Sequence, residues 1–267
     1  MQAFLRWAGG KVHHTKRLIT YLPKDLNEYT YWEPFLGGGS IFFAISPSKA
    51  ILSDSNSHLI DCYQMVRDSP DRVAFYLKKL IEKTTEVAYY KVREDYNKSP
   101  KSIKQAARFI YLNKTSYNGI FRVNSSGFYN VPFGKKEKPT FPSLETLRSV
   151  SALLKRAKLN VYSYEKILMN VKKRDFIYLD PPYPPLNGTS FFTHYTKERF
   201  GKDDQINVSA IANQMSRLGC RVMISNADIP LIHNLYKGWN ISTLPVTRWI
   251  TCKSFRHKVN ELVITNY

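Results

Sequence analysis

Four consecutive residues, DPPY at positions 180–183, directly follow an apolar run with the pattern of a strand buried on both faces. Proline has no N–H group, so this segment presents the carboxylate of Asp180 and backbone carbonyls, all of them hydrogen-bond acceptors. Such acceptors suit an exocyclic amino group with its two N–H donors, and Tyr183 offers a flat ring on which a base could stack. We therefore expect a site for a nucleobase amine here, although the same residues could also form a turn that merely ends a strand.

A glycine-rich loop, EPFLGGGS at positions 33–40, follows the first predicted strand and leads into a helix. Glycine lets a backbone turn tightly and approach a ligand closely. Asp54 ends the next predicted strand, where an acidic side chain can bind ribose hydroxyls. The chain has neither GxGxxG nor a Walker sequence, so dinucleotides and nucleoside triphosphates are weakly supported. Alternatively, the glycines could form a plain tight turn, and Asp54 could cap the following helix. Together with the DPPY segment, however, the loop and Asp54 favour a pocket for a nucleoside-bearing cofactor beside a pocket for a base.

Segments of strand pattern alternate with segments of helical periodicity, which predicts an α/β fold with a mainly parallel sheet and helices on both faces. Ligands of such sheets bind beyond the carboxyl ends of the strands, where DPPY is expected to lie. Helical spacing of apolar residues covers positions 144–154 and 206–218. The predicted strands are residues 31–35, 50–53, 159–163, 176–180, 221–225, 240–244 and 261–265.

The alternation stops between about residues 55 and 142, where we find no convincing buried strand. Amphipathic helices are predicted over residues 59–67, 73–82 and 103–113. A strand–turn–strand pattern follows, with arms at 120–123 and 128–131 around the turn residues 124–127. We therefore expect an inserted helical domain, residues 56–142, that ends in a hairpin at about 117–134 and interrupts a cofactor-binding catalytic domain made of residues 1–55 and 143–267.

The chain of 267 residues carries a formal net charge of +19, and 43% of its residues are hydrophobic. This composition is typical of a globular protein, and the charge favours a partner with phosphate groups, although it does not separate DNA, RNA and an anionic membrane. Three distant cysteines without a CxxC pair predict neither a disulfide framework nor a zinc site. No apolar run is long enough for a membrane span and no signal peptide begins the chain, so we expect a soluble, cytoplasmic protein.

Several further motifs occur in a fixed order along the chain. They are FLRWAGGK at 4–11, YNG at 117–119, Arg122, NVPFG at 130–134, Phe192-Thr193 with Tyr195, and VNEL at 259–262. With the EPFLGGGS loop, Asp54 and DPPY, they make the chain resemble the Dam-type (D12 class, alpha group) DNA adenine-N6 methyltransferases over residues 4–267. The resemblance implies a Rossmann-like methyltransferase fold with a seven-stranded mixed sheet and an inserted helical DNA-recognition domain carrying a β-hairpin. It also implies methyl transfer from S-adenosyl-L-methionine to N6 of a flipped adenine in double-stranded DNA, within GATC.

The resemblance assigns catalytic and cofactor roles to individual residues. Asp180 and the carbonyl of Pro181 would accept hydrogen bonds from the target amino group, and Tyr183 would stack on the flipped adenine. The implied cofactor-binding residues are Trp7, Gly10, Lys11, Phe35, Gly37, Ser40, Asp54, Ser163, Tyr164 and Asp180. Ser163 and Tyr164 stand where the family usually has an acidic residue followed by Phe, so the contact with the cofactor's adenine differs here. The resemblance implies neither a metal ion nor an obligate protein partner.

The resemblance also assigns residues to DNA. Arg122 would read a guanine in the major groove, where guanine presents two acceptors that match a guanidinium group. Arg6, where the family often has Lys, would contact the first base of the site. The implied DNA-binding residues are Arg6, Tyr117, Asn118, Ile120, Arg122, Asn124, Pro132 and Lys135; among them, Ile120 and Pro132 would touch a thymine methyl and Tyr117 would wedge into the stack. The alternative for Arg122 is that it only grips a phosphate.

The residues also separate this chemistry from related activities. Direct displacement at an amine needs positioning and no cysteine nucleophile, unlike methylation at a cytosine carbon. A cytosine-N4 methyltransferase typically begins the tetrapeptide with Ser, and enzymes acting on RNA or on a protein glutamine often begin it with Asn, whereas this chain has Asp180. A DNA-binding protein without catalytic activity is the remaining alternative, against which the intact Trp7, Lys11, Asp54 and Asp180 argue.

Overall fold

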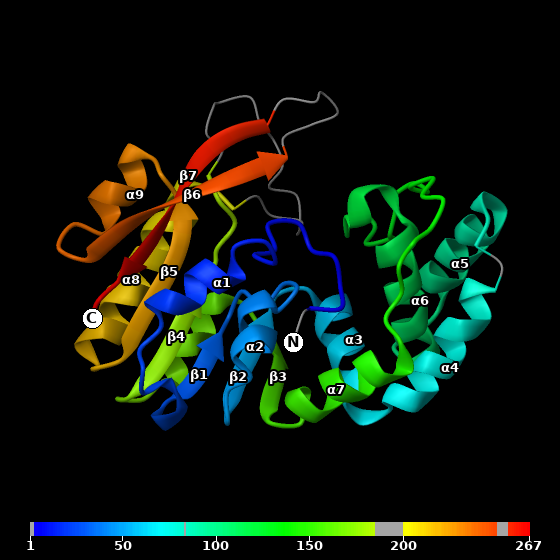
Figure 1. The fold of residues 1–267 in the computed structure, drawn as a ribbon, viewed down its shortest axis with the longest axis horizontal. Helices are drawn as coiled ribbons and strands as arrows, with labels where there is room; N and C mark the ends of the chain where they lie inside the picture. The colour runs from blue at the N-terminus through cyan, green and yellow to red at the C-terminus, as the bar shows by residue number, and fades with distance from the viewer. Residues whose placement is uncertain (1–2, 83, 185–199, 250–255) are drawn as a thin grey trace.

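The computed structural model describes residues 3–82, 84–184, 200–249 and 256–267, with backbone only at 247–249 and 256–258. Within these residues, one sheet contains seven strands in the order β3-β2-β1-β4-β5-β7-β6 (Figure 1). The strands are β1 Thr30–Glu33, β2 Ala50–Asp54, β3 Ala157–Val161, β4 Asp175–Leu179, β5 Arg221–Ala227, β6 Asn240–Trp249 and β7 Arg256–Thr265. The pairs from β3 to β5 are parallel, and β7 pairs antiparallel with both β5 and β6. The seven-stranded mixed sheet is thus confirmed.

The strand order reverses between β1 and β4. From β1 the chain proceeds outward through β2 to β3, and it then returns to β4 on the other side of β1. The carboxyl ends of β1 and β4 lie side by side because the two strands are parallel, with Trp32 opposite Ile177. A reversal of this kind opens a crevice at the strand ends, where ligands of α/β proteins bind. The glycine-rich loop and DPPY both begin at this point.

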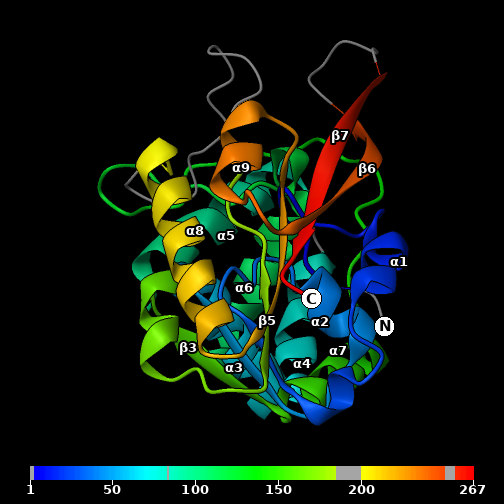
Figure 2. The same ribbon diagram turned by 90° about the vertical axis from the view of Figure 1, so that its left-hand side faces the viewer.

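Helices cover both faces of the sheet (Figure 2). α1 Thr15–Leu18 and α2 Ser40–Ile45 lie on one face, and α8 Lys202–Arg217 and α9 Pro230–Leu235 lie on the other. Side chains that alternate along β4 therefore enter different cores: Phe176 and Tyr178 join one buried cluster, and Ile177 and Leu179 join the second. Burial on both faces explains the uninterrupted apolar run that predicted this strand.

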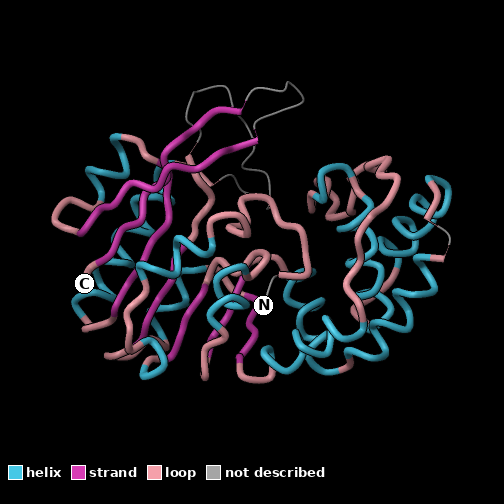
Figure 3. The backbone as a smooth tube through the Cα atoms, viewed as in Figure 1, coloured by secondary structure: helices cyan, strands magenta, loops and turns pink. Residues whose placement is uncertain are grey.

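Between β2 and β3 the chain forms a group of helices that extends away from the sheet (Figure 3). They are α3 Ser57–Asp68, α4 Pro70–Ile81, α5 Glu86–Lys98 and α6 Ile103–Thr115, and α7 Leu144–Leu154 follows. Asn56, Thr85, Ser102 and Ser143 cap α3, α5, α6 and α7 by accepting backbone N–H groups. The apolar core runs without a break from the sheet through α3 to α4 and α6. The division at residues 55/56 and 142/143 stays a prediction.

Helix α5 is missing from the sequence prediction, and its presence explains a second difference. The turn at 124–127 is confirmed, since Gly127 N donates to Asn124 O. The two arms, however, form no strands: one β-bridge joins Val123 to Tyr129, and Asn130 N donates to the carbonyl of Arg122 at 3.2 Å. Side chains of α5 satisfy more of the backbone of the second arm: Asn97 bonds both the N–H and the carbonyl of Tyr129, and Tyr89 and Arg93 donate to the carbonyl of Val131. We call residues 117–134 the recognition loop.

In the part of the chain that the structure describes, no helix combines the length and apolar character needed to cross a membrane.

Candidate active site

Asp180 lies directly beyond β4, all five residues of which are buried. Its Oδ1 atom is 2.8 Å from Nζ of Lys11, and the two side chains are 18% and 6% exposed. The ammonium group of Lys11 also donates to the carbonyl of Gly9 at 3.0 Å and lies 4.4 Å from the ring centre of Tyr183. The FLRWAGGK segment and DPPY, distant in the sequence, therefore meet at this ion pair.

Two further acidic side chains, Glu33 and Glu261, interact electrostatically with Asp180. The Tyr183 hydroxyl donates to Glu261 Oε2 at 3.2 Å, and the Tyr31 hydroxyl donates to Glu33 Oε2 at 2.7 Å. Burial raises the pKa of Glu33 to about 8, opposed by the Tyr31 hydrogen bond and reinforced by the charge of Asp180. The pKa of Asp180 is itself raised by burial and lowered by Lys11. The surroundings of Asp180 are thus rich in acceptors, and Lys11 is a cation that favours the ionised form of Asp180.

Asp54 joins the glycine-rich loop to the start of α3. Its Oδ2 accepts from Gly37 N and its Oδ1 accepts from Asn56 N, each at 2.9 Å. Burial raises the pKa of Asp54, and these two N–H groups lower it. The alternative that Asp54 caps the helix is wrong, because Asn56 is the N-cap and accepts from Leu59 N at 3.2 Å. One carboxylate oxygen of Asp54 instead holds the loop at Gly37, and the other holds the backbone of Asn56.

The loop passes against Trp7. Gly37 has φ +47°, and a Cβ atom there would lie 2.7 Å from Cδ1 of the indole, so a larger residue would displace the ring. A Cβ atom at Gly10 would lie 2.9 Å from the carbonyl oxygen of Trp7. The buried Ser40 hydroxyl has no hydrogen-bond partner among the described residues. These close approaches and the unpaired hydroxyl are features of a surface shaped to hold a ligand.

Phe35, Ser163 and Tyr164 form a second part of the expected cofactor site. The rings of Phe35 and Tyr164 stack with their centres 5.1 Å apart, and Asn207 Nδ2 donates to the Tyr164 hydroxyl. The Ser163 hydroxyl donates to the carboxylate of Glu165. An acidic side chain is therefore present two residues after the position where the family pattern has one.

The residues expected to contact DNA meet at the recognition loop. Tyr117 N donates to the carbonyl of Pro132 at 2.9 Å, and the Tyr129 hydroxyl donates to the carbonyl of Ile120 at 3.2 Å. The exposed Arg122 donates from Nε to Asn130 Oδ1 at 2.8 Å. The Asn124 side chain accepts from Phe128 N within the turn, while Asn118 and Lys135 have positive φ values.

Arg6 lies outside the loop in sequence but against it in space, since a Cβ atom at Gly119 would be 2.9 Å from Cβ of Arg6. The motif residues Phe192, Thr193 and Tyr195, like Cys252, lie outside the described residues. Within the described ranges, no group of three His, Cys, Asp or Glu side chains could hold a metal ion.

Comparison with known proteins decides the identity of this arrangement. Residues 7–251 match the sequence model of a protein family, the D12 class N6 adenine-specific DNA methyltransferases. The chain belongs to this family. It is therefore an enzyme, an adenine-specific DNA methyltransferase, and DNA is its substrate.

Relatives match this D12 methyltransferase along nearly its whole length. Type II methyltransferase M.MjaIII of Methanocaldococcus jannaschii is 39% identical, with 100% of this chain and 99% of the relative covered. Type II methyltransferase M1.LlaDCHI of Lactococcus lactis subsp. cremoris is 34% identical, with 100% and 96% covered. DNA adenine methylase of Escherichia coli K12 is 36% identical, with 98% and 94% covered.

The structure of this D12 methyltransferase brings into the site several residues to which the sequence motifs give no role. Glu33 and Glu261 lie in motifs that were recognised, yet only the folded chain brings Glu261 to Tyr183 and exposes Glu33 to the charge of Asp180. Lys114 is half-buried at the end of α6, and burial together with the charges of Arg6 and Lys136 lowers its pKa to about 8. Its place near the end of a predicted helix, followed by the YNG motif, is the signal that could have identified it.

Proposed function

We propose that this D12 methyltransferase transfers the methyl group of S-adenosylmethionine to N6 of an adenine in GATC, after that adenine has left the duplex stack. The observation that carries the proposal is the junction at the carboxyl ends of β1, β2 and β4. There the acceptor cleft of Asp180 adjoins the loop that Asp54 and Gly37 form. The amine of a base and a nucleoside cofactor would bind side by side at such a junction. The target nitrogen is inaccessible inside a duplex, which requires base flipping.

The residues around the glycine-rich loop fit the cofactor. Ser40 offers an unpaired buried hydroxyl, and the approach of Gly37 and Gly10 to Trp7 leaves backbone groups close to the indole. Asp54 is placed for the ribose hydroxyls, and the Phe35–Tyr164 stack offers an aromatic wall for the adenine. Ser163 would face the same adenine, while Lys11 and Asp180 border the reacting end. When bound, the cofactor supplies a methyl group on a positively charged sulfur atom.

Asp180 and Pro181 would act on the amino group of the target adenine. The lone pair of this nitrogen is conjugated into the ring, so the free amine is a weak nucleophile. Hydrogen bonds from both N–H groups, to the carboxylate of Asp180 and the carbonyl of Pro181, favour tetrahedral geometry and release the lone pair for attack. Lys11 favours the ionised form of Asp180, which can then accept the proton that the methylated nitrogen loses. Tyr183 would hold the base by stacking.

The recognition loop would read the sequence. Arg122 is exposed and oriented by Asn130, so its outer nitrogens remain available to guanine. Arg6 is positioned against Gly119 to contact the first base, and Ile120 and Pro132 would contact a thymine methyl. Tyr117 would fill the space of the extruded adenine. Asn118, Asn124 and Lys135, together with a net charge of +19, would hold the phosphates.

Sequencing of DNA from cells that express the chain, in a host without adenine methylation of its own, tests this proposal. We expect N6-methyladenine in GATC sites and none when Asp180→Ala is expressed at the same level. Thermal unfolding of the purified variant shows whether it is folded. Methylated cytosine in place of adenine, or normal adenine methylation by folded Asp180→Ala, would contradict the acceptor mechanism. Methyladenine in another sequence would refute GATC as the target and leave the acceptor mechanism standing.

A further inference from the structure

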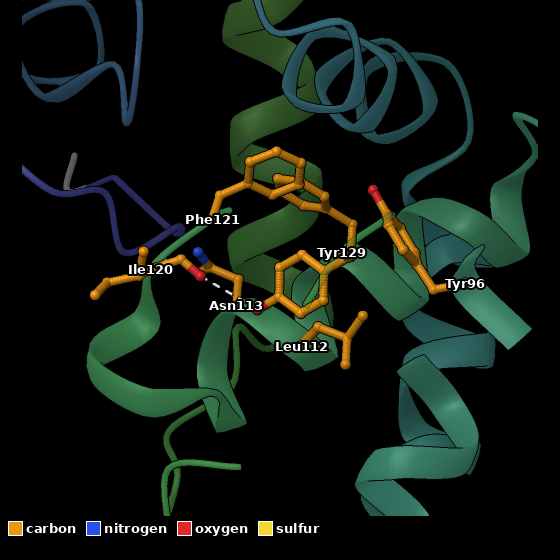
Figure 4. Close-up of a pocket in the computed structure, with 7 residues that line it drawn as sticks. Tyr96, Leu112, Asn113, Ile120, Phe121 and Tyr129 are labelled. Atoms are coloured by element: carbon orange, nitrogen blue, oxygen red, sulfur yellow. Dashed lines mark hydrogen bonds between the residues drawn. The ribbon is translucent and has the colours of Figure 1, made fainter. Parts of the chain in front are cut away.

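The side chain of Asn113, at the end of α6, joins two separate segments of the chain. It accepts from Arg6 N at 2.8 Å and donates to Arg6 O at 2.7 Å and to Gly119 O at 3.4 Å. Asn113 is only 4% exposed, and Figure 4 shows it beside Ile120, at the base of the recognition loop. The Asn113 amide therefore pairs with the backbone N–H and carbonyl of Arg6 as a neighbouring strand would. The same amide also bonds the recognition loop at the carbonyl of Gly119.

The two segments that Asn113 joins also touch directly. Gly119 has φ +66°, and its missing side chain leaves room for Cβ of Arg6. Further along the two segments, the ring of Trp7 stacks on Phe121, with centres 6.1 Å apart and planes at 18°. Within the loop, the rings of Phe121 and Tyr129 lie with their centres 5.6 Å apart. The position of Arg6 relative to the loop is thus set by these contacts around a buried amide.

Asn97 on α5 repeats this bonding pattern on the other arm of the loop. It accepts from Tyr129 N at 2.8 Å and donates to Tyr129 O at 3.0 Å. The next residue, Asn130, accepts from Arg122 Nε at 2.8 Å. Asn113 therefore fixes the backbone of Arg6. Asn97 fixes the backbone of Tyr129, which precedes Asn130, the hydrogen-bond partner of Arg122.

We propose that Asn113 and Asn97 are positioning residues for sequence discrimination, Asn113 through Arg6 and Asn97 through Arg122; this rests on the proposed function. A bidentate contact between arginine and a base edge tolerates little displacement, whereas a phosphate contact tolerates more. A displacement of either arginine therefore reduces the preference for the correct base more than it reduces DNA binding. The two asparagines act at different base pairs, because Asn113 holds the backbone of Arg6 and Asn97 holds the backbone next to Asn130, which orients Arg122.

Aspartate substitutions test this with little change in side-chain shape. In Asn113→Asp, one oxygen can still accept from Arg6 N, but the other faces the carbonyls of Arg6 and Gly119. Asn97→Asp places an oxygen against the carbonyl of Tyr129 in the same way. Asn266→Asp is the matched control: Asn266 accepts from Val222 N at 2.8 Å and donates to Cys220 O at 2.9 Å, at the opposite end of the sheet from Asp180.

The measurement is kcat/KM on the best site of the wild type and on every single-base variant of that site. Asn113→Asp should lower discrimination by about tenfold at the base pair where Arg6→Ala also lowers it, the loss expected from one weakened arginine–base contact. Asn97→Asp should do so at the base pair affected by Arg122→Ala. Asn266→Asp should lower the melting temperature and leave discrimination unchanged at every position.

A double-mutant cycle separates positioning from a general loss of structure. In the Arg6→Ala background, Asn113→Asp should cause no further loss at that base pair, since its effect passes through Arg6. Equal loss on every sequence, or a loss that simply adds to that of Arg6→Ala, would refute the proposal. If Asn113→Asp does not fold, Asn113→Ala and Asn97→Asp test the proposal through the same ratios of kcat/KM between the best site and its single-base variants. If the wild type prefers a site other than GATC, the proposed target sequence is refuted. The ratios of kcat/KM between the preferred site and its single-base variants still decide the role of both asparagines.

Discussion

Nζ of Lys11 lies 2.8 Å from Oδ1 of Asp180, and only 6% and 18% of the two side chains are exposed. Lys11 comes from the FLRWAGGK segment and Asp180 from the end of β4, so the contact forms only in the folded chain. Burial raises the pKa of Asp180, and Lys11 acts against this effect. A carboxylate that accepts an amine proton needs such a partner, because an isolated buried carboxyl group would keep its own proton.

Lys11→Met should therefore shift the acidic limb of the kcat profile to higher pH. Without the ammonium group, burial raises the pKa of Asp180 unopposed, and a larger fraction of the enzyme is inactive at a given acidic pH. Profiles of kcat at saturating cofactor and DNA would show the shift. Lys16→Met removes the same charge from an exposed position and should leave the limb in place. An unmoved limb in Lys11→Met would exclude this role.

Arg122→Ala and Lys135→Ala should differ in their dependence on DNA sequence. Arg122 is held by Asn130 and can form a fork with guanine, so its loss should cost about 1–3 kcal/mol on the preferred site and much less on a site altered at that guanine. The exposed Lys135 is a point charge, so its loss should weaken all sites about equally and reduce the salt slope of DNA binding by roughly one. Kinetics and binding on single-base variants, at several salt concentrations, distinguish the two. Uniform loss in Arg122→Ala would indicate a phosphate contact.

DNA affinity should fall as the pH rises through the pKa of Lys114. Burial, Arg6 and Lys136 lower this pKa to about 8, whereas a neighbouring phosphate would raise it. Binding above pH 8 must therefore include uptake of a proton, and the affinity declines with increasing pH. Titrations at constant ionic strength between about pH 7 and about pH 9 would measure the decline. Lys114→Met should flatten it, and Lys135→Ala should not; a decline that persists in Lys114→Met would assign the effect to another group.

Glu33→Gln should stabilise the fold increasingly as the pH rises. Burial raises the pKa of Glu33 from 4.5 to about 8, so between these values the folded chain keeps a proton that the unfolded chain has lost. The contribution of Glu33 to stability is thus complete below the unfolded pKa and is lost as the pH rises through the folded one. Glutamine can still accept from the Tyr31 hydroxyl but does not ionise.

Melting temperatures of both proteins across this pH window check the Glu33 prediction. The difference between Glu33→Gln and the wild type should grow with pH, whereas the exposed Glu82→Gln should show a constant difference. A difference for Glu33→Gln that does not depend on pH would show that this carboxyl group titrates normally in the folded chain.

Local patterns in the sequence were enough to predict much of this enzyme. All seven strands were recognised, β6 and β7 only in part, because burial on both faces, or an end at Gly, Asp or Asn, is visible in a few consecutive residues. The turn at 124–127 was equally visible, since its residue types tolerate the required backbone conformation. The positions of DPPY and the glycine-rich loop at strand ends followed directly, because parallel strands bring their carboxyl ends to one edge.

Only the tertiary structure determined which buried polar and charged groups pair with one another. Helix α5 has a weak apolar pattern, yet its Asn97 bonds the N–H and the carbonyl of Tyr129, backbone groups that a longer strand pairing would otherwise satisfy. The contacts of Asn113 with Arg6, and of Lys11 with Asp180, join segments more than a hundred residues apart. Buried backbone groups and charges must find partners, but the sequence does not specify which distant side chain supplies them, because that depends on how the complete core packs.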